Sequence, residues 1–420
     1  RGRGFQFVAD VQPIREAAGR PVEKRAAPHT RAEQPSMIIL PFQTFGDSAE
    51  LAAIADGLVE NLTTILTRVP LLALMSRSSS FALKDRAVSA EDVRRDLGVG
   101  YMLEGSIQEQ AGQVRANIQL IETKNGFHLW AQQFDRPQGA NVISELLHDI
   151  LPRLEPQLVR AMFNGLGDEN GELSSRQLLL RAMGLLSLKG WHRETFREAA
   201  ELLRQSITLE PGLALTHAYL ALILALGHRV GVLQKSEAVV REAVTEAETA
   251  LELDSMDSNV LGLAGCALAD VGQPGRALAL LRNAVELNPN NGQAWAALGS
   301  AELLNGSMND AIRSLAHGIA ISPKDSRLSV WKSLLSIAYL QSKDLERALV
   351  AAEEGCQCDD RTYLPRVLLA AVHLVGGKSG EAETAFSECL RVKPDLTAEE
   401  IAGLVGVKLG AKLEALRALG

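Results

Sequence analysis

Side chains of the types that most often carry out catalysis are scattered through this sequence. Its eight His do not form an HExxH motif, and there is no P-loop and no Gly-x-Ser-x-Gly elbow. The closest pair of thiols is Cys356 and Cys358, and no second Cys or His pair stands nearby at the spacing of metal ligands. We therefore expect a protein that is not an enzyme, with no catalytic residues, no metal and no cofactor.

One short stretch, SRSSSF at 76–81, gathers groups that could hold an anion. Arg77 offers a guanidinium, and Ser78 and Ser79 offer hydroxyls, directly after an expected strand. Serine runs in such loops most often serve turn formation instead. Arg77, Ser78 and Ser79 are thus candidates for an anion or ligand loop, with ordinary turn chemistry as the alternative.

An α/β domain is expected over residues 37–165. The runs MIILPF and LLALM predict two short buried strands, and the spacing of the apolar residues between them predicts a helix. Three further strands are expected at 101–109, 114–122 and 127–135, joined by tight turns at Ala-Gly and Lys-Asn-Gly. A helix near 140–163 closes the domain, whose sheet is mixed.

Beyond the break at 165–172 the strand pattern ends and a repeat of 34 residues begins. Each repeat has a small residue in its first helix and an Ala in its second. The small residues are Ser187, Ala221, Gly265, Gly299, Ser333 and Ala370, and the alanines are Ala199, Ala243, Ala277, Ala311, Ala348 and Ala382. Their spacing is 12 in four repeats, 22 after Ala221 and 15 after Ser333, which predicts insertions of 10 and 3 residues between the paired helices.

These positions resemble the tetratricopeptide repeat, most clearly at Trp295, Gly299, Ala311 and Pro323. The resemblance implies an all-α solenoid of about six repeats over 174–396, with a capping helix at 397–420. Such solenoids commonly bind peptides or proteins on their concave surface. Five residues should face that groove: Asn259, Cys266, Gln293, Ala296 and Ser300.

The α/β segment is similar to a second family. ILPFQTFG, IADGLVENLTTILTRV, SRSSSFALKDRAV, LGVGYMLEGSIQ and HLWAQQFDRP resemble, in the same order, the TolB-amino-terminal-like domain. This domain precedes tetratricopeptide repeats in bacterial regulators and in some class III adenylate cyclases. The resemblance identifies a module and no ligand.

The first ten residues, RGRGFQFVAD, resemble the last wing strand of an OmpR/PhoB-type winged helix. The resemblance implies that Arg1 and Arg3 contact DNA and that most of the winged helix lies upstream. Residues 11–36 contain three Pro and mixed charges, which is typical of a flexible linker.

The overall composition limits the partners. A net charge of -8 argues against nucleic-acid binding along the whole chain, so any DNA contact should be local. The longest apolar runs fall short of the roughly 18 to 20 residues that span a bilayer, so we expect a cytoplasmic protein without membrane contact.

The first hypothesis is a bacterial transcription regulator. Its upstream winged helix would bind DNA, and the TolB-like domain and repeats would sense a signal, hold a protein or peptide partner, or form a homo-oligomer. Two alternatives remain open: the regulatory region of a class III adenylate cyclase, and a tetratricopeptide scaffold protein.

Overall fold

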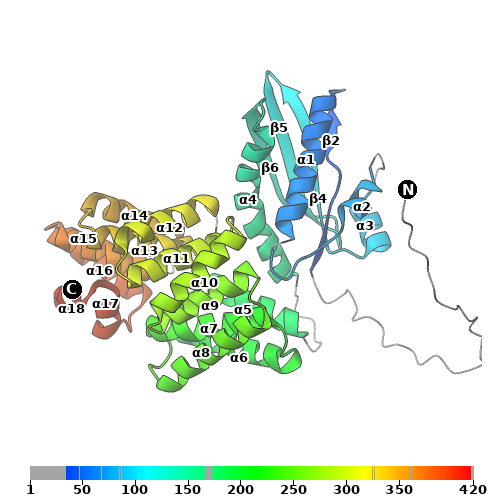
Figure 1. Cartoon of the computed structure of the whole chain (residues 1–420). Helices are drawn as coiled ribbons and strands as arrows, with labels where there is room; N and C mark the ends of the chain where they lie inside the picture. Colours follow the sequence, from blue (N-terminus) through cyan, green and yellow to red (C-terminus); the bar gives the residue numbers. More distant parts are fainter. Residues whose placement is uncertain are drawn as a thin grey trace, which may run out of the picture.

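The computed structural model describes residues 35–417, except 47, 68, 85, 87, 166–172, 324, 326, 360 and 361. The expected wing strand, including Arg1 and Arg3, and the linker up to residue 34 lie outside the described residues. The described chain forms an α/β domain followed by an array of paired helices, as expected (Figure 1).

The sheet of the α/β domain is mixed, with strand order β3-β1-β4-β5-β6. Its strands are β1 (Ser36–Ile39), β2 (Gln43–Phe45), β3 (Ala73–Leu74), β4 (Tyr101–Gln110), β5 (Gln113–Glu122) and β6 (His128–Pro137). β1 pairs in parallel with β3 and β4, β2 also pairs in parallel with β4, and β4, β5 and β6 form an antiparallel meander. The sequence patterns predicted every strand except the short β2.

Helices cover both faces of this sheet. On one face α1 (Ala49–Leu66) and α4 (Val142–Asn164) bury the inward side chains of the meander. On the other face lie α2 (Arg77–Phe81) and α3 (Ala90–Leu97), with Val93 packed against Ile38 and Met102. Because β1 is buried on both faces, it reads in the sequence as a continuous apolar run.

Six helix pairs follow, which confirms the expected solenoid of repeats. They are α5 (Ser175–Lys189) with α6 (Arg193–Leu209), α7 (Ala214–Arg229) with α8 (Glu237–Leu253), α9 (Ser258–Asp270) with α10 (Pro274–Leu287), α11 (Gly292–Leu304) with α12 (Met308–Ile321), α13 (Leu328–Gln341) with α14 (Leu345–Cys358), and α15 (Leu364–Val375) with α16 (Ser379–Val392).

Small residues let the paired helices approach closely. A Cβ added at Gly299 would lie 2.6 Å from Leu315 Cγ and 3.0 Å from the Ala311 carbonyl oxygen. In the fifth repeat the equivalent residue is Ser336, whose hydroxyl donates to the Ala348 carbonyl over 2.8 Å. The expected position Ser333 is therefore wrong. Ser336 restores the 12-residue spacing, and the additional residues lie between α12 and α13 instead of between paired helices.

The Trp position of the repeat makes the same type of hydrogen bond in two repeats. The Trp295 indole Nε1 donates to the Pro289 carbonyl over 2.8 Å. In the second repeat His217 takes this place, with its Nε2 2.9 Å from the Pro211 oxygen. The His217 Nδ1 lies 2.5 Å from Glu246 Oε2, and this hydrogen bond raises the pKa of the imidazole. In the second repeat His217 thus makes the contact with the Pro carbonyl that Trp295 makes in the fourth repeat.

The insertion in the second repeat brings the start of the array against its end. It lengthens α7 and leaves a connection at 230–236, from which Lys235 Nζ reaches Glu399 Oε1 at 2.6 Å. The Tyr363 hydroxyl donates to the Val230 carbonyl over 3.5 Å, and Trp191 packs against the C-terminal apolar cluster. We call this set of contacts the closure contact.

The C-terminal cap consists of two helices, not the single one expected over 397–420. α17 (Ala398–Val405) begins with a capping box between Thr397 and Glu400, and α18 (Val407–Leu416) follows. They are separated by Gly406, whose φ of 83° ends α17 in a conformation that suits glycine.

Candidate functional site

Charged side chains from distant repeats meet on the inner surface of the array. Arg229 ends α7, Asp270 ends α9, and Asp325 and Arg327 lie just before α13. Arg327 and Asp325 influence the pKa of Tyr219 in α7, although two repeats separate α7 from α13. Side chains so far apart along a solenoid meet only across its concave side. We call Tyr219, Arg229, Cys266, Asp270, Gln293, Ser300, Asp325 and Arg327 the inner cluster.

Arg229 links three repeats within this cluster. Its Nη1 donates to Asp270 Oδ1, and it also donates to Ser300 Oγ over 3.2 Å. The Asp270 side chain is 1% exposed, and its second oxygen is buried without a hydrogen-bond partner among the described residues. Burial works against the charge of Arg229, but Asp270 more than offsets this and the pKa is raised. Arg229 therefore stays charged at the centre of the inner surface.

A second ion pair lies nearer the α/β domain. Arg327 donates to Asp325 from Nε over 2.8 Å and from Nη2 over 2.6 Å, and its guanidinium lies 5.3 Å from the centre of the Trp331 ring. Burial and then the negative charge of Asp270 raise the pKa of the neighbouring Cys266 thiol. Cys266 is therefore not a reactive thiolate at neutral pH.

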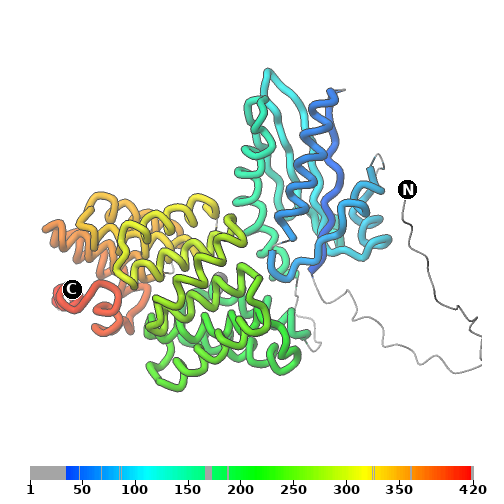
Figure 2. The backbone as a smooth tube through the Cα atoms, in the orientation of Figure 1, coloured from blue at the N-terminus to red at the C-terminus, as the bar shows by residue number. Residues whose placement is uncertain are grey.

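The α/β domain contributes one acidic side chain to this region. α4 runs from the sheet down to the array (Figures 1 and 2), and its Glu155 lies close enough to Asp325 for the two charges to interact. Burial, and to a lesser degree Asp325, raises the pKa of Glu155 to about 7. Within the described chain no hydrogen bond or ion pair reaches its carboxylate.

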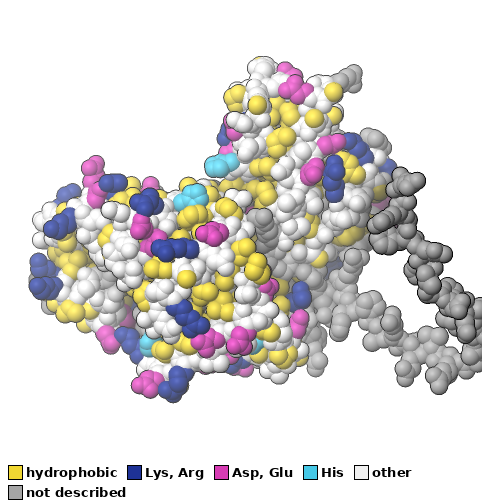
Figure 3. All heavy atoms as spheres, viewed as in Figure 1, with side chains coloured by type: hydrophobic (Ala, Val, Ile, Leu, Met, Phe, Trp, Pro, Cys, Tyr) yellow, Lys and Arg dark blue, Asp and Glu magenta, His cyan; other side chains and the backbone are white. Residues whose placement is uncertain are grey.

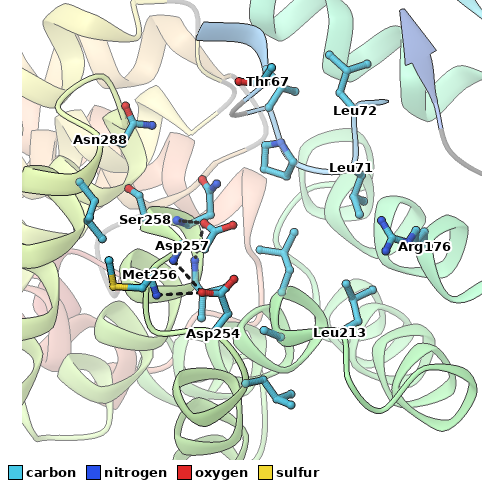
Figure 4. Close-up of a pocket in the computed structure, with 18 of the residues that line it drawn as sticks. Thr67, Leu71, Leu72, Arg176, Leu213, Asp254, Met256, Asp257, Ser258 and Asn288 are labelled. Atoms are coloured by element: carbon cyan, nitrogen blue, oxygen red, sulfur yellow. Dashed lines mark hydrogen bonds between the residues drawn. The ribbon is translucent and has the colours of Figure 1, made fainter. Parts of the chain in front are cut away.

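A pocket of about 570 Å³ opens between the two domains. One wall is the segment from Val69 to Leu72, and the opposite wall is formed by connections between repeats, including Asp254, Asp257 and Asn259. Figure 4 shows the carboxylates of Asp254 and Asp257 across the pocket from Leu71 and Arg176. Leu71 has a φ of 65°, an uncommon value for a side chain of its size.

The five expected groove residues differ in position. Asn259, Cys266 and Gln293 are half-buried, and Asn259 also lines the pocket. Gln293 Oε1 has no hydrogen-bond partner among the described residues.

Ala296 does not face the groove, so that expectation is wrong, and Ser300 lies on the inner surface but is buried there. Ala296 packs against Leu328 and Trp331 of the next repeat, and Ser300 is bound by Arg229. The reason is that neighbouring repeats stack closely and bury this part of α11.

The sequence patterns predict none of the charged residues in this region: Glu155, Arg229, Asp270, Asp325 and Arg327. A signal was present for two of them. Arg229 and Asp270 each follow a long apolar run at the end of a helix, LALILALGHR and LAGCALAD. A charge at the end of an otherwise buried helix indicates a buried partner.

In the predicted anion loop, Arg77 and Ser79 already have partners within the chain. Arg77, Ser78 and Ser79 begin α2, where Ser76 Oγ accepts from the Ser79 amide over 3.2 Å and lies 3.0 Å from the Ser79 hydroxyl. The Arg77 guanidinium lies 4.5 Å from the Phe81 ring centre and 3.8 Å from Glu60. The arrangement is that of turn chemistry, the alternative considered above.

The rest of the described surface has mixed charge. On the face in Figure 3, Lys and Arg side chains over the repeats are interspersed with Asp and Glu. Among the described residues, no three His, Cys, Asp or Glu are grouped so that they could hold a metal ion. The same part of the chain has no helix long and apolar enough to cross a membrane.

Comparisons with known proteins identify the repeats. A family profile described as "Tetratricopeptide repeat" matches residues 263–326. The chain is 30% identical over 240 residues to "Putative adenylate cyclase 3" of Rhizobium meliloti (strain 1021), a match that covers 52% of this chain and 39% of that protein. The chain thus spans well under half of the length of this relative.

Solved structures with paired helices are also similar. "Crystal structure of APC/C hetero-tetramer Cut9-Hcn1" matches with a TM-score of 0.45 and 18% identity, over 66% of this chain and 48% of that one. "Crystal structure of YrrB: a TPR protein with an unusual peptide-binding site" matches with a TM-score of 0.33 and 15% identity, over 51% of this chain and 99% of that one.

Proposed function

We propose that this chain is the effector region of a bacterial transcription regulator and that it binds a protein or peptide partner on the inner surface of its repeats. The observation that carries the partner-binding part is the inner cluster, where charged side chains from α7, α9 and the segment before α13 meet and Arg229 also binds Ser300 of α11. Buried charge of this kind is costly unless it is paired or used. In this proposal the protein acts by binding and not by turnover, in the cytoplasm.

DNA binding in this proposal rests on the resemblance of RGRGFQFVAD to a wing strand. In the full-length protein, Arg1→Ala with Arg3→Ala should weaken DNA binding by a similar factor on all sequences, since phosphate contacts carry little sequence information. Residues 1–420 alone should bind duplex DNA weakly and lose that affinity as salt rises. Tight, sequence-specific binding by this chain alone would contradict the assignment.

The second candidate is the regulatory region of a nucleotide cyclase, which the Rhizobium relative favours by its name. The residues encoded before Arg1 distinguish the two. A helix-turn-helix pattern there supports the regulator, and a cyclase domain supports the alternative. Partner binding by the repeats is common to both.

The partner site can be tested by site-specific photo-crosslinking. A photoreactive amino acid at Gln293 should form adducts with the partner in cells, and the same group at Val350, which is 48% exposed on α14, should not. Adducts from Val350 alone would place the partner elsewhere. Adducts between two copies of this chain would identify a homo-oligomer instead.

A further inference from the structure

The sheet of the α/β domain has one long strand at its edge. β6 is ten residues long, and among the described strands it pairs only with β5. On the other side of the sheet, β3 and β2 have two and three residues. Apart from the Arg136 guanidinium, which donates to the Asp135 carbonyl over 2.8 Å, no group outside β5 hydrogen-bonds to the β6 backbone in the described chain. The outer peptide groups of β6 are therefore open to a further strand.

The β6 strand lacks the features that usually protect such an edge. Natural edge strands are kept from pairing by Lys or Pro, by short length, or by bulges. From His128 to Phe134 the strand contains no Lys, Arg, Asp, Glu or Pro. One register shift lies near its start, and from Trp130 onward the pairing with β5 is regular. The edge thus keeps the geometry that the addition of a strand requires.

The side chains along this edge are largely apolar on both faces of the sheet. On the face covered by α4, the ring centres of Trp130 and Phe134 lie 6.2 Å apart. On the opposite face Leu129 and Ala131 are exposed, Leu129 over 39% of its surface. Phe127, just before the strand, is 67% exposed. Because residues of neighbouring strands pack against each other on both faces, a segment with apolar side chains suits this edge.

Positive charge is in excess at one end of the edge. The Arg136 guanidinium pairs with Asp149 of α4, and Arg153 Nη1 lies 3.8 Å from the same carboxylate. Within the described chain no second acidic side chain lies at ion-pair distance from either arginine. The Arg153 guanidinium is also 5.8 Å from the centre of the Phe134 ring, which places it beside β6. An acidic residue on an added strand would balance this charge.

We propose that the edge of β6 takes up an extended segment of a partner protein as an additional strand. The segment carries β-branched apolar side chains and an acidic residue that meets Arg136 and Arg153. Its backbone hydrogen bonds to β6 supply affinity, and its side chains supply specificity. This surface belongs to the α/β domain and is separate from the inner surface of the repeats. The inference therefore does not depend on the partner site proposed above.

A second copy of this chain fits the edge poorly. Symmetric antiparallel pairing would set two β6 strands about 4.8 Å apart. Since α4 lies over β6, where its Asp149 and Arg153 contact Arg136 and Phe134, the two copies of α4 would come to a similar spacing (Figure 1). Packed helices need about 8 to 10 Å between their axes. A single added strand without a helix on this face avoids that clash.

Peptide binding to the whole chain tests the inference. The probe is a fluorescent peptide of about ten residues, with alternating Val and Thr and an Asp at each end. One matched peptide has Lys at each end, and another keeps Asp but has N-methyl groups on its central amides, which prevent strand pairing. By anisotropy the unmethylated Asp peptide should bind at least about tenfold more tightly than either. Equal binding of the methylated peptide, or no binding of the Asp peptide, would overturn the inference.

Variants of the chain locate the site. Ala131→Glu places a negative charge beside the added strand and should weaken binding of the Asp peptide at least about fivefold. Gln119→Glu makes a similar change directly opposite on β5, one strand further away, and should stay within about twofold. Arg136→Gln should reduce the preference for Asp over Lys roughly three- to tenfold. The control is Arg95→Gln in α3, on the other face of the sheet, where the arginine also pairs with an aspartate.

Hydrogen exchange separates this inference from the proposed function. The bound Asp peptide should slow the exchange of β6 amides and leave α11 unchanged, because an added strand gives the outer amides of β6 an acceptor. Protection of the repeats with β6 unchanged would contradict the inference and leave the Gln293 crosslinks as an independent test of the inner surface. A dimer that forms without peptide and is lost in Ala131→Glu would assign the edge to a second copy instead. Circular dichroism of each variant excludes loss of folding as the cause.

Discussion

The two edges of the repeat array differ in how they are covered. At the edge formed by the turns within repeats, the closure contact joins Trp191 and residues 230–236 to the C-terminal helices. At the edge formed by the connections between repeats, a pocket of about 570 Å³ remains open beneath the α/β domain. Apolar packing holds the sealed edge, and the open edge carries the buried Gln293 Oε1, which has no hydrogen-bond partner among the described residues. The difference agrees with the proposal above, in which the sealed edge serves stability and the open edge lies beside the partner site.

The largest effect is expected from removing the aromatic anchor of the sealed edge. Trp191 packs on the C-terminal cluster and edge-to-face on Phe196, with ring centres 5.9 Å apart. Trp191→Ala should lower the free energy of unfolding by about 3 kcal/mol in chemical denaturation. Leu253→Ala at the open edge, where the side chain is 44% exposed, is the control and should cost less than about 1 kcal/mol. Equal losses would mean that the edges do not differ.

The packing between the edges should also respond strongly. Gly299→Leu would force its side chain against Leu315 and the Ala311 carbonyl, and should cost about 2 kcal/mol. Gln293→Ala on the inner surface should stay within about 0.5 kcal/mol of the original. Thermal melting of both variants checks the repeat register, and a larger effect of the Gln293 variant would refute it.

The open edge should impose a pH dependence. The native pKa of Glu155 is about 7, above its ordinary value of 4.5, so between these values the native state holds more protons than the unfolded chain. The contribution of this group to stability therefore falls as the pH rises from about 4.5 to 7. Glu155→Gln should remove this slope and raise the stability at pH values above about 7 by on the order of 1 kcal/mol. Chemical denaturation of both proteins across this pH range tests the prediction. If the stability of the variant changes with pH as steeply as that of the original, the prediction is wrong.

The smallest effect is expected at the rim of the sealed edge. Lys235 and Glu399 form an ion pair whose side chains are 49% and 74% exposed. Lys235→Ala should cost no more than about 0.5 kcal/mol, and added salt should reduce even this difference. A loss as large as that of Trp191→Ala would show that charge, not apolar packing, holds the closure contact.

The sequence predicted the fold more fully than the site, for a physical reason. Strand alternation in Val114, Ala116 and Ile118 and the close helix contact at Gly299 depend on nearby residues, so local patterns reveal them. The register error at Ser333 arose because serine also stands three residues later, and only the hydrogen bond from Ser336 to Ala348 distinguishes them.

The inner cluster depends instead on contacts between residues far apart in the chain. Arg229 lies 41 residues from Asp270 and 71 from Ser300 in the sequence. Glu155 interacts electrostatically with Asp325 because α4 runs from the sheet to the array (Figure 1). Counting from the Trp295 anchor of the repeat predicts that Gln293 and Asn259 face inward, but it does not indicate which charges meet there. Neither residue spacing nor composition contains that information.

The closure contact also bears on how the array unfolds. An open solenoid behaves as a line of neighbours, so its end repeats fray first and unfolding proceeds in steps. Here the Tyr363 hydroxyl binds the Val230 carbonyl across 133 positions of sequence, which joins the two ends. A chain of repeats without free ends has no preferred place for unfolding to begin. Its repeats should therefore exchange their amide hydrogens with similar protection, and lose their structure together.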